Sequence, residues 1–349
     1  MPVISETSPP TLDRLASLLG VANQNAALAI EALCSESAVL SDGVQQSCPD
    51  AGQVEVAAQI RALVGQSQLA VLAVDQVPRF VIDRTAPHAL GVELDLDPRA
   101  AWQRGAHQLA PDRYSVHCTP QIHGALLDQL RRSRQIAEHA VIDAACTAGA
   151  CSGPQWRESV ATGGHRRSTK ASGVANFKAA IAALSSISER RLAKLLDPKQ
   201  NNGLPASLVP NPDGNHYGLM VLRYRAALLV SQLSDLATPV CSTPLSAWAA
   251  ADQEAAQDAD ESAPADGMCD ALANVLALER FAAVQALRVR IAMLQRVYGP
   301  AAIPMPGDFA KSVIDQFDAA GLEAIWDGRK LQDEIDTAAQ LLLKSPAQA

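Results

Sequence analysis

Apolar residues recur at intervals of three and four along most of this chain, the spacing that places side chains on one face of an α-helix. The longest such repeat comprises Phe177, Ala180, Ile181, Leu184, Ile187, Leu192 and Leu195. A near-heptad repeat covers residues 122–144, as expected for a long helix in a left-handed bundle. Further repeats predict helices over residues 12–19, 26–33, 272–293 and 338–343. The chain is therefore predicted to be mostly helical.

The segment from residue 187 to 231 is predicted to form the centre of this bundle. A turn at Asn201-Asn202-Gly203 and three following prolines make a rigid loop between two helices. This loop brings Asn211 and Asn215 to the start of the second helix. That helix, over residues 219–237, is apolar on most sides, which is typical of a helix inside a large bundle.

A few segments depart from the helical pattern. Two short apolar runs, residues 69–74 and 79–83, predict a small surface β-hairpin. Residues 146–173 are rich in Gly, Ser and Thr and are interpreted as a loop, and residues 250–267 as a mobile acidic loop.

The predicted fold class is all-α, a bundle of long helices. We expect a flexible tail over residues 1–10 and a single helical-bundle domain over residues 11–349, in which residues 66–110 form a divergent insert. An aromatic content of only 4% agrees with closely packed helices better than with a β-sheet.

The composition of the chain argues against several classes of function. A formal net charge of −8 argues against a nucleic-acid partner, because neutralising phosphates requires clustered Lys and Arg. The seven cysteines show no CxxC spacing and no zinc pattern, which favours free thiols in a reducing cytoplasm. The first residues do not resemble a secretion signal and no apolar run is long enough to span a membrane. We therefore expect a cytoplasmic protein without a membrane partner.

Several motifs appear in a characteristic order. They are Gly52-Gln53-Val54-Glu55-Val56-Ala57, Asp112-Arg113-Tyr114-Ser115 with Pro120-Gln121, Ser188-Glu189-Arg190-Arg191, Gly203-Leu204-Pro205, Asn211-Pro212 and Asp252-Gln253-Glu254. Together with a late helix over residues 276–290, this order and spacing resemble the aromatic amino acid lyase family, the histidine and phenylalanine ammonia-lyases. The resemblance covers roughly residues 26–64 and 111–297.

The resemblance implies a helical bundle that assembles as a tetramer with sites built from several chains. In the family, an amino-terminal Ala-Ser-Gly cyclises into the electrophile 4-methylidene-imidazol-5-one (MIO), near a general-base tyrosine and an asparagine. Met1 corresponds to a point well inside the family's chain, beyond all three. We therefore expect no cofactor and no ordinary ammonia-lyase chemistry from this chain alone. Ala171-Ser172-Gly173 falls where a different helix begins, and we interpret it as a coincidence.

Three residues are candidates for catalysis. Tyr114 matches a family tyrosine that lies over the electrophile and substrate, where a phenol serves as general acid or base; the alternative is a structural tyrosine. His117 replaces the family arginine that grips the substrate carboxylate, so it is a candidate proton shuttle or a satisfied, partly buried histidine. Glu254 matches a glutamate that contacts the substrate amine or ring, or is one charge among many on an acidic loop.

Three further residues are candidates for substrate binding. Asn211 matches an active-site asparagine and Asn215 lies close by, although both are also suited to cap the next helix. His165 falls at a family phenylalanine when residues are counted back from Ser188.

These residues leave three functional hypotheses. The first is a diverged MIO-less enzyme that moves protons in an elimination, addition, isomerisation or cyclisation of an amino-acid-derived or aromatic small molecule. The second is a non-catalytic subunit that partners a separate MIO-bearing chain. The third is a vestigial fragment. We expect a homotetramer or a hetero-oligomer with such a chain.

Overall fold

The computed structural model describes residues 9–35, 37–48, 50–72, 76–81, 91–93, 114–145, 163–209, 218–237, 264–300, 303–325 and 332–344. Its long helices are α1 (Pro9–Ala32), α3 (Ala51–Val64), α6 (Thr119–Ala145), α8 (Gly163–Leu196), α9 (Met220–Ala237), α11 (Pro264–Tyr298), α12 (Asp308–Ala319) and α13 (Gln332–Lys344). Short helical elements are η1 (Ala38–Leu40), α2 (Asp42–Gln45), η2 (Leu69–Val71), α5 (Tyr114–His117) and η5 (Ala206–Leu208). The predicted all-α class is confirmed.

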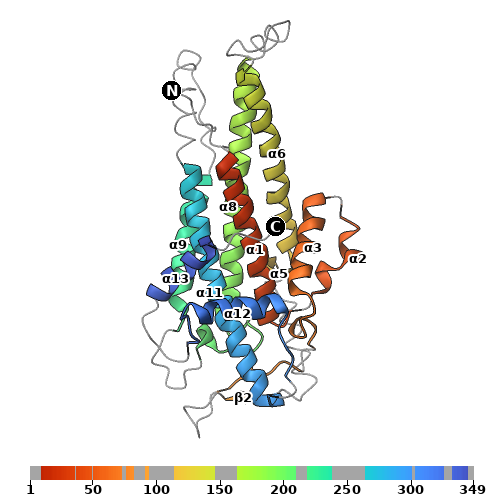
Figure 1. Cartoon of the computed structure of the whole chain (residues 1–349), viewed down its shortest axis with the longest axis vertical. Helices are drawn as coiled ribbons and strands as arrows, with labels where there is room; N and C mark the ends of the chain where they lie inside the picture. The colour runs from red at the N-terminus through yellow and green to blue at the C-terminus, as the bar shows by residue number, and fades with distance from the viewer. Residues whose placement is uncertain are drawn as a thin grey trace.

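The longest helices stand side by side along the long axis of the molecule, and α12 lies across them (Figure 1). Helix α1 packs against α3, α6 and α11, while α11 also packs against α8, α9 and α13. From the second half of the chain, α11 is the main neighbour of α1, and α8 packs mostly against α11, α9 and α6. The bundle is assembled from segments that are far apart in sequence.

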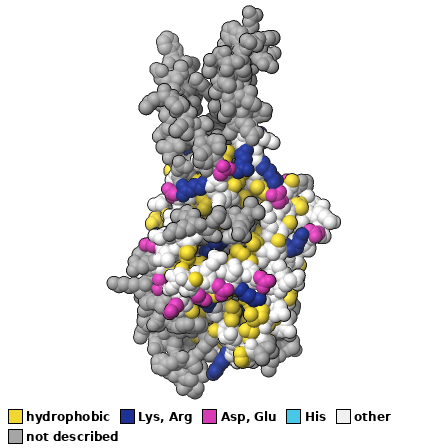
Figure 2. Space-filling model, in the orientation of Figure 1, with side chains coloured by type: hydrophobic (Ala, Val, Ile, Leu, Met, Phe, Trp, Pro, Cys, Tyr) yellow, Lys and Arg dark blue, Asp and Glu magenta, His cyan; other side chains and the backbone are white. Residues whose placement is uncertain are grey.

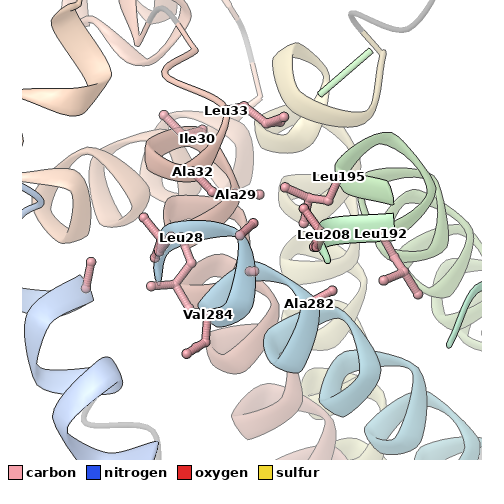
Figure 3. Packing of buried hydrophobic residues seen from close by; sticks show 14 of the residues in the cluster. Leu28, Ala29, Ile30, Ala32, Leu33, Leu192, Leu195, Leu208, Ala282 and Val284 are labelled. Carbon is pink, nitrogen blue, oxygen red and sulfur yellow. The ribbon is translucent and has the colours of Figure 1, made fainter. Parts of the chain in front are cut away.

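The main core lies where α1, α8 and α11 meet (Figure 3). Buried side chains of α1 in this core include Ala26, Ala27, Leu28, Ala29, Ile30, Ala32 and Leu33. Leu192 and Leu195 from α8 and Ala282 and Val284 from α11 face them. The alanines let the helices approach closely, and each buried leucine contributes about 1.5–3 kcal/mol of transfer free energy. A second cluster, around Leu15, Ile181 and Leu272, continues the core along the bundle.

Two expected helix boundaries were wrong. The predicted helices over residues 12–19 and 26–33 form one continuous helix, α1. The polar residues between them do not interrupt it, because the buried Asn25 amide donates to the carbonyl of Leu276 at 2.8 Å. Helix α8 begins at Gly163, so part of the loop expected over residues 146–173 is helical. A long helix can include Gly, Ser and Thr despite their weak helix propensities, because extending an existing helix costs less free energy than starting a new one.

The acidic loop expected over residues 250–267 ends earlier than predicted. Helix α11 begins at Pro264, a residue type that favours the first turn of a helix because its missing N–H is not needed there. The remainder of that segment lies outside the described residues.

The small β-hairpin is present, but its strands pair differently from the prediction. Strand β1 (Arg79–Phe80) pairs antiparallel with β2 (Val92–Glu93), with Arg79 opposite Glu93. An ion pair of 3.0 Å joins these two side chains. Residues 69–71 form η2 instead of a strand, because Leu69 and Ala70 are buried against the bundle.

Helix α9 is only half covered. Leu222, Ala226 and Leu233 are buried, whereas an opposite stripe of Val221, Tyr224, Leu228 and Leu236 is exposed. These four residues, which we call the α9 stripe, recur at helical spacing on one face. Within one chain, α9 is therefore a surface helix, contrary to the expectation of an interior helix.

Charges of both signs alternate over the face shown in Figure 2. Among the described residues, ion pairs join Arg14 to Asp270 and Arg134 to Asp13. On this face, the described surface offers no broad basic patch of the kind that binds a phosphate backbone. In the part of the chain that the structure describes, no helix is long and apolar enough to cross a membrane.

Candidate active site

The candidate site begins at α5, the four-residue helix that carries Tyr114 and His117. Tyr114 is 51% exposed, whereas the next two residues, Ser115 and Val116, are buried. His117 is partly buried on the same short helix. The backbone N–H of Cys118 donates to the Tyr114 carbonyl at 3.1 Å and continues the turn towards α6. The turn is thus anchored in the bundle by buried residues, while Tyr114 is exposed at the surface of the protein.

Beneath α5 lies the buried guanidinium of Arg191, from the Ser-Glu-Arg-Arg motif of α8. Its Nε donates to Glu279 Oε1 of α11 at 2.5 Å, and both side chains are fully buried. Its Nη1 donates to the Ser115 carbonyl at 3.4 Å and to Thr119 Oγ1 at 3.2 Å. Because its two sides contact different helices, Arg191 links α11 to the turn that carries Tyr114.

A chain of hydrogen bonds runs outward from Arg191. Its Nη1 lies 3.5 Å from His123 Nε2, and His123 Nδ1 lies 2.7 Å from Asn23 Oδ1. Since the arginine and the amide oxygen can only donate and accept respectively, the proton of the neutral imidazole must sit on Nδ1. Asn23 Nδ2 then donates to Gln59 Oε1 at 2.8 Å. Burial, with the Arg191 charge adding to it, holds the pKa of His123 well below its usual range.

A second buried arginine adjoins this cluster. Arg280 Nε donates to Asn25 Oδ1 at 2.8 Å, and Asn25 Nδ2 donates to Glu279 Oε2 at 3.2 Å. Burial lowers the pKa of Arg280 to about 10, although the Glu279 charge opposes the shift. Arg191 thus contacts the Glu279 carboxylate directly, whereas Arg280 is connected to it through the Asn25 amide. A buried group of charges in which every partner is hydrogen-bonded costs much to break, because removal of one member leaves another unpaired.

The loop that contains Asn211 and Asn215 is closed at its base. The N–H of Leu219 donates to the Ser207 carbonyl at 3.0 Å, so the two ends of the loop meet. Ser207 has a φ of 54° and Leu208 a φ of 60°, which places both residues in the strained left-handed region. The Gln285 amide of α11 holds this strained turn by donating to the Leu208 carbonyl at 3.2 Å.

Arg290 fixes the preceding turn. This fully buried side chain donates to the carbonyls of Ala32 at 3.1 Å, Pro78 at 3.0 Å, Asn201 at 3.2 Å and Asn202 at 2.8 Å. Its acceptors belong to the end of α1, the segment before β1 and the turn after α8. Burial lowers its pKa, since no carboxylate is among these acceptors.

The structure brings together part of the predicted site. Tyr114 and His117 share α5. The position of His165 is in α8, but its side chain is not described, and Glu254, Asn211 and Asn215 lie outside the described residues.

The sequence predictions missed the buried polar cluster. Its members are Arg191, Glu279, Arg280, His123, Asn23 and Asn25. Charged residues inside the otherwise apolar run of residues 276–290 were the available signal, because an unpaired charge is not tolerated there.

Neither a metal nor an MIO group fits the described residues. No three His, Cys, Asp or Glu side chains within them form a metal-binding group. Ala171, Ser172 and Gly173 lie inside helix α8, where their backbone is held in regular α-helical geometry. Ring closure within such a triplet requires a sharply bent loop, so this Ala-Ser-Gly does not suit the cyclisation.

The fold is thus a bundle of long helices in which the α5 turn with Tyr114 rests on buried Arg191 of the Ser-Glu-Arg-Arg motif. The family model for aromatic amino acid lyases matches residues 10–305, and the chain belongs to this family. Histidine ammonia-lyase from Streptomyces coelicolor is 28% identical over 325 residues, which cover 93% of this chain and 54% of that enzyme. Histidine ammonia-lyase from Deinococcus radiodurans is 33% identical over 232 residues, covering 66% of this chain and 38% of that enzyme.

Solved structures show the same fold. Histidine ammonia-lyase from Trypanosoma cruzi matches with a TM-score of 0.65 and 19% identity, covering 97% of this chain and 55% of that one. Ergothionase from Treponema denticola matches with a TM-score of 0.67 and 18% identity, covering 97% of this chain and 59% of that one. The chain spans about half the length of the curated relatives that match most of it.

Proposed function

We propose that this chain is a diverged lyase-type enzyme that carries out proton transfer without an MIO electrophile of its own. Its substrate would be an amino-acid-derived or aromatic small molecule, in an elimination, addition, isomerisation or cyclisation. The observation that carries the proposal is the placement of Tyr114, whose phenol is 51% exposed on a turn that is anchored in the buried core. A tyrosine that serves only packing would bury its ring, whereas Tyr114 is exposed.

Tyr114 and His117 would divide the proton transfers between them. They stand three residues apart on α5, and residues at this spacing face the same side of a helix. An imidazole and a phenol in such a pair supply one acid and one base at neutral pH. Glu254 would be the third catalytic group, as a carboxylate that binds a cation or accepts a proton.

Substrate binding would fall to Asn211, Asn215 and His165. The closed base of the loop between Val209 and Gly218 supports this role, since it holds the ends of the segment that contains both asparagines. His117 in place of an arginine removes the two-pronged grip on a carboxylate. The proposal therefore favours substrates that bind through an aromatic ring or an amine more than through a carboxylate.

The alternative function is a non-catalytic subunit that pairs with a separate MIO-bearing chain. The exposed α9 stripe supports association in either case, because its side chains are 54% (Val221), 67% (Tyr224), 61% (Leu228) and 43% (Leu236) exposed. A contiguous apolar stripe of this kind marks an interface. We propose a homotetramer for the enzyme and a hetero-oligomer for the alternative.

The test combines Tyr114→Phe with a substrate screen. The purified protein is incubated with histidine, phenylalanine, tyrosine and their 2,3-unsaturated acids, and products are followed by mass spectrometry. Tyr114→Phe is expected to abolish turnover and ligand-induced stabilisation with little change in melting temperature, because only one half-exposed hydroxyl is lost.

Tyr224→Phe is the control, since it removes a hydroxyl from another exposed tyrosine, on α9, that is 67% exposed against 51% for Tyr114. Its activity should equal that of the parent protein. Full activity of Tyr114→Phe would refute the catalytic assignment. Turnover that appears only after an MIO-bearing lyase chain is added, with co-elution of both chains, would support the alternative instead.

A further inference from the structure

We infer that Arg191, held in place by Glu279, is a positioning residue that sets the orientation of the α5 turn and thereby of Tyr114 and His117. This inference rests on the proposed function, in which those two side chains do the chemistry. Arg191 itself is fully buried beneath the turn and would not touch the substrate.

The α5 turn depends on tertiary contacts for its position. A helix of four residues has too few hydrogen bonds to be stable alone. Its inward side is covered, with Ser115 at 0% and Val116 at 2% exposure. The Ser115 carbonyl accepts two hydrogen bonds from below, one from Arg191 Nη1 and one from Thr119 Oγ1 at 3.1 Å.

Thr119 connects the charge of Arg191 to the turn. Its hydroxyl oxygen accepts from Arg191 Nη1 at 3.2 Å while its proton goes to the Ser115 carbonyl. The guanidinium, the hydroxyl and the carbonyl therefore form a closed triangle of hydrogen bonds. Because a hydrogen bond to a charged donor is stronger than a neutral one, this triangle adds to the few hydrogen bonds of the short helix in holding the turn.

The direction of the guanidinium is set from the opposite side. Glu279 accepts from Nε at 2.5 Å and lies 3.5 Å from Nη2, so it contacts one edge of the planar group. Ser188 Oγ accepts from Nη2 at 3.2 Å. With that edge occupied, Nη1 is left pointing at α5. A rigid planar fork transmits orientation in this way, whereas a lysine ammonium does not.

The consequence for function is geometric. A reacting group displaced by about 1 Å loses about a hundredfold in rate, even when the change lies away from the chemistry. Loosening the triangle should therefore lower kcat more than it raises KM, because the substrate contacts are left intact.

The experiment compares three single variants. Thr119→Val keeps the shape of the side chain and removes the hydroxyl that joins Arg191 to α5. Thr119→Ser keeps that hydroxyl and serves as the conservative rescue. Ser188→Ala is the matched control, since it removes a different hydroxyl from the same guanidinium, while the 2.5 Å bond from Nε to Glu279 still holds the orientation of that group.

Two readouts need no substrate. Hydrogen–deuterium exchange is measured for peptides that cover residues 114–122, and labelling of Cys118 by a maleimide is followed by peptide mapping. Cys118 is a partly exposed free thiol directly after α5. Thr119→Val removes both hydrogen bonds of that hydroxyl and should raise both rates by at least about fivefold. Thr119→Ser and Ser188→Ala should leave both rates near the parent values.

A paired variant keeps the inference testable if Thr119→Val does not fold. Arg191→Met with Glu279→Gln removes both charges of the ion pair and keeps an amide oxygen for Asn25, the residue that binds Arg280. This double variant is expected to fold and to show the same rise in exchange at residues 114–122. With an active substrate, Thr119→Val should also lower kcat with little change in KM.

Equal exchange in Thr119→Val and Ser188→Ala, or a double variant with parental exchange at α5, would overturn the positioning role. The exchange and labelling results do not depend on catalysis. They therefore stand or fall separately from the Tyr114→Phe result, which tests the proposed function.

Discussion

His123 should make the stability of this bundle depend on pH below about 6.5, the ordinary pKa of histidine. The imidazole is fully buried, with Asn23 Oδ1 at 2.7 Å on one side and Arg191 at 3.5 Å on the other. A second proton would place a new cation beside the Arg191 guanidinium, out of reach of water. The folded state therefore keeps His123 neutral, while the unfolded chain protonates it freely.

The sign and size of the pH effect on stability follow from the different protonation of His123 in the folded and unfolded states. Between the lowered pKa of the folded state and a pH of about 6.5, the unfolded chain binds more protons than the folded protein, so stability rises with pH. The contribution of His123 is complete above that window and is lost as the pH falls through it. One proton corresponds to a slope of about 1.4 kcal/mol per pH unit. Lowering the pH from about 6.5 to about 5 should thus cost about 2 kcal/mol through this residue alone.

The assay is urea unfolding at several pH values between about 5 and 8, at one protein concentration, for the parent and for His123→Gln. Glutamine does not titrate, and its amide still donates and accepts hydrogen bonds. The variant should be less stable at pH 8, yet the gap should narrow by about 2 kcal/mol towards pH 5. Other titrating groups, Glu31 among them, are present in both proteins and cancel in the difference. Parallel curves for the two proteins would refute the buried neutral histidine.

Three further changes probe the packing and the surface. Arg290→Lys should cost about 2–4 kcal/mol in urea unfolding, because one ammonium cannot reach four carbonyls from three segments; an unchanged midpoint would contradict this. Gly124→Ala should cost about 1–3 kcal/mol, since its new Cβ would lie 2.4 Å from the backbone N of Gln53 in α3. Gly43→Ala is the control and should be near neutral, because its Cβ would meet nothing within 4 Å. Leu228→Lys should dissociate the oligomer in light scattering, and Val54→Lys, an exposed apolar control on α3, should not. Unaltered assembly of the first variant would exclude the α9 stripe as an interface.

The sequence by itself determined the fold class, the family and most of the helices. Helical periodicity is a local property, so the repeat that ends near Leu195 predicted the later part of α8, and the one over residues 122–144 predicted most of α6. The order and spacing of several motifs identified the family, because both reflect the path of the whole chain through the fold. Tyr114 and His117 were predicted as a site for the same reason, and they do share one short helix.

Tertiary structure decided which polar residues are buried and what each of them contacts. Arg191 and Glu279 are 88 residues apart and His123 and Asn23 are 100 apart, so neither pairing is visible in any local pattern. The strand partner of Arg79 likewise lies at Glu93, beyond the run that was expected to pair. Burial removes water from these groups, and the partners that replace it come from whichever helices happen to cross at that point. For that reason the Ser-Glu-Arg-Arg motif could be recognised in the sequence. The contact of its Arg191 with α5 could be seen only in the packing of α5, α8 and α11.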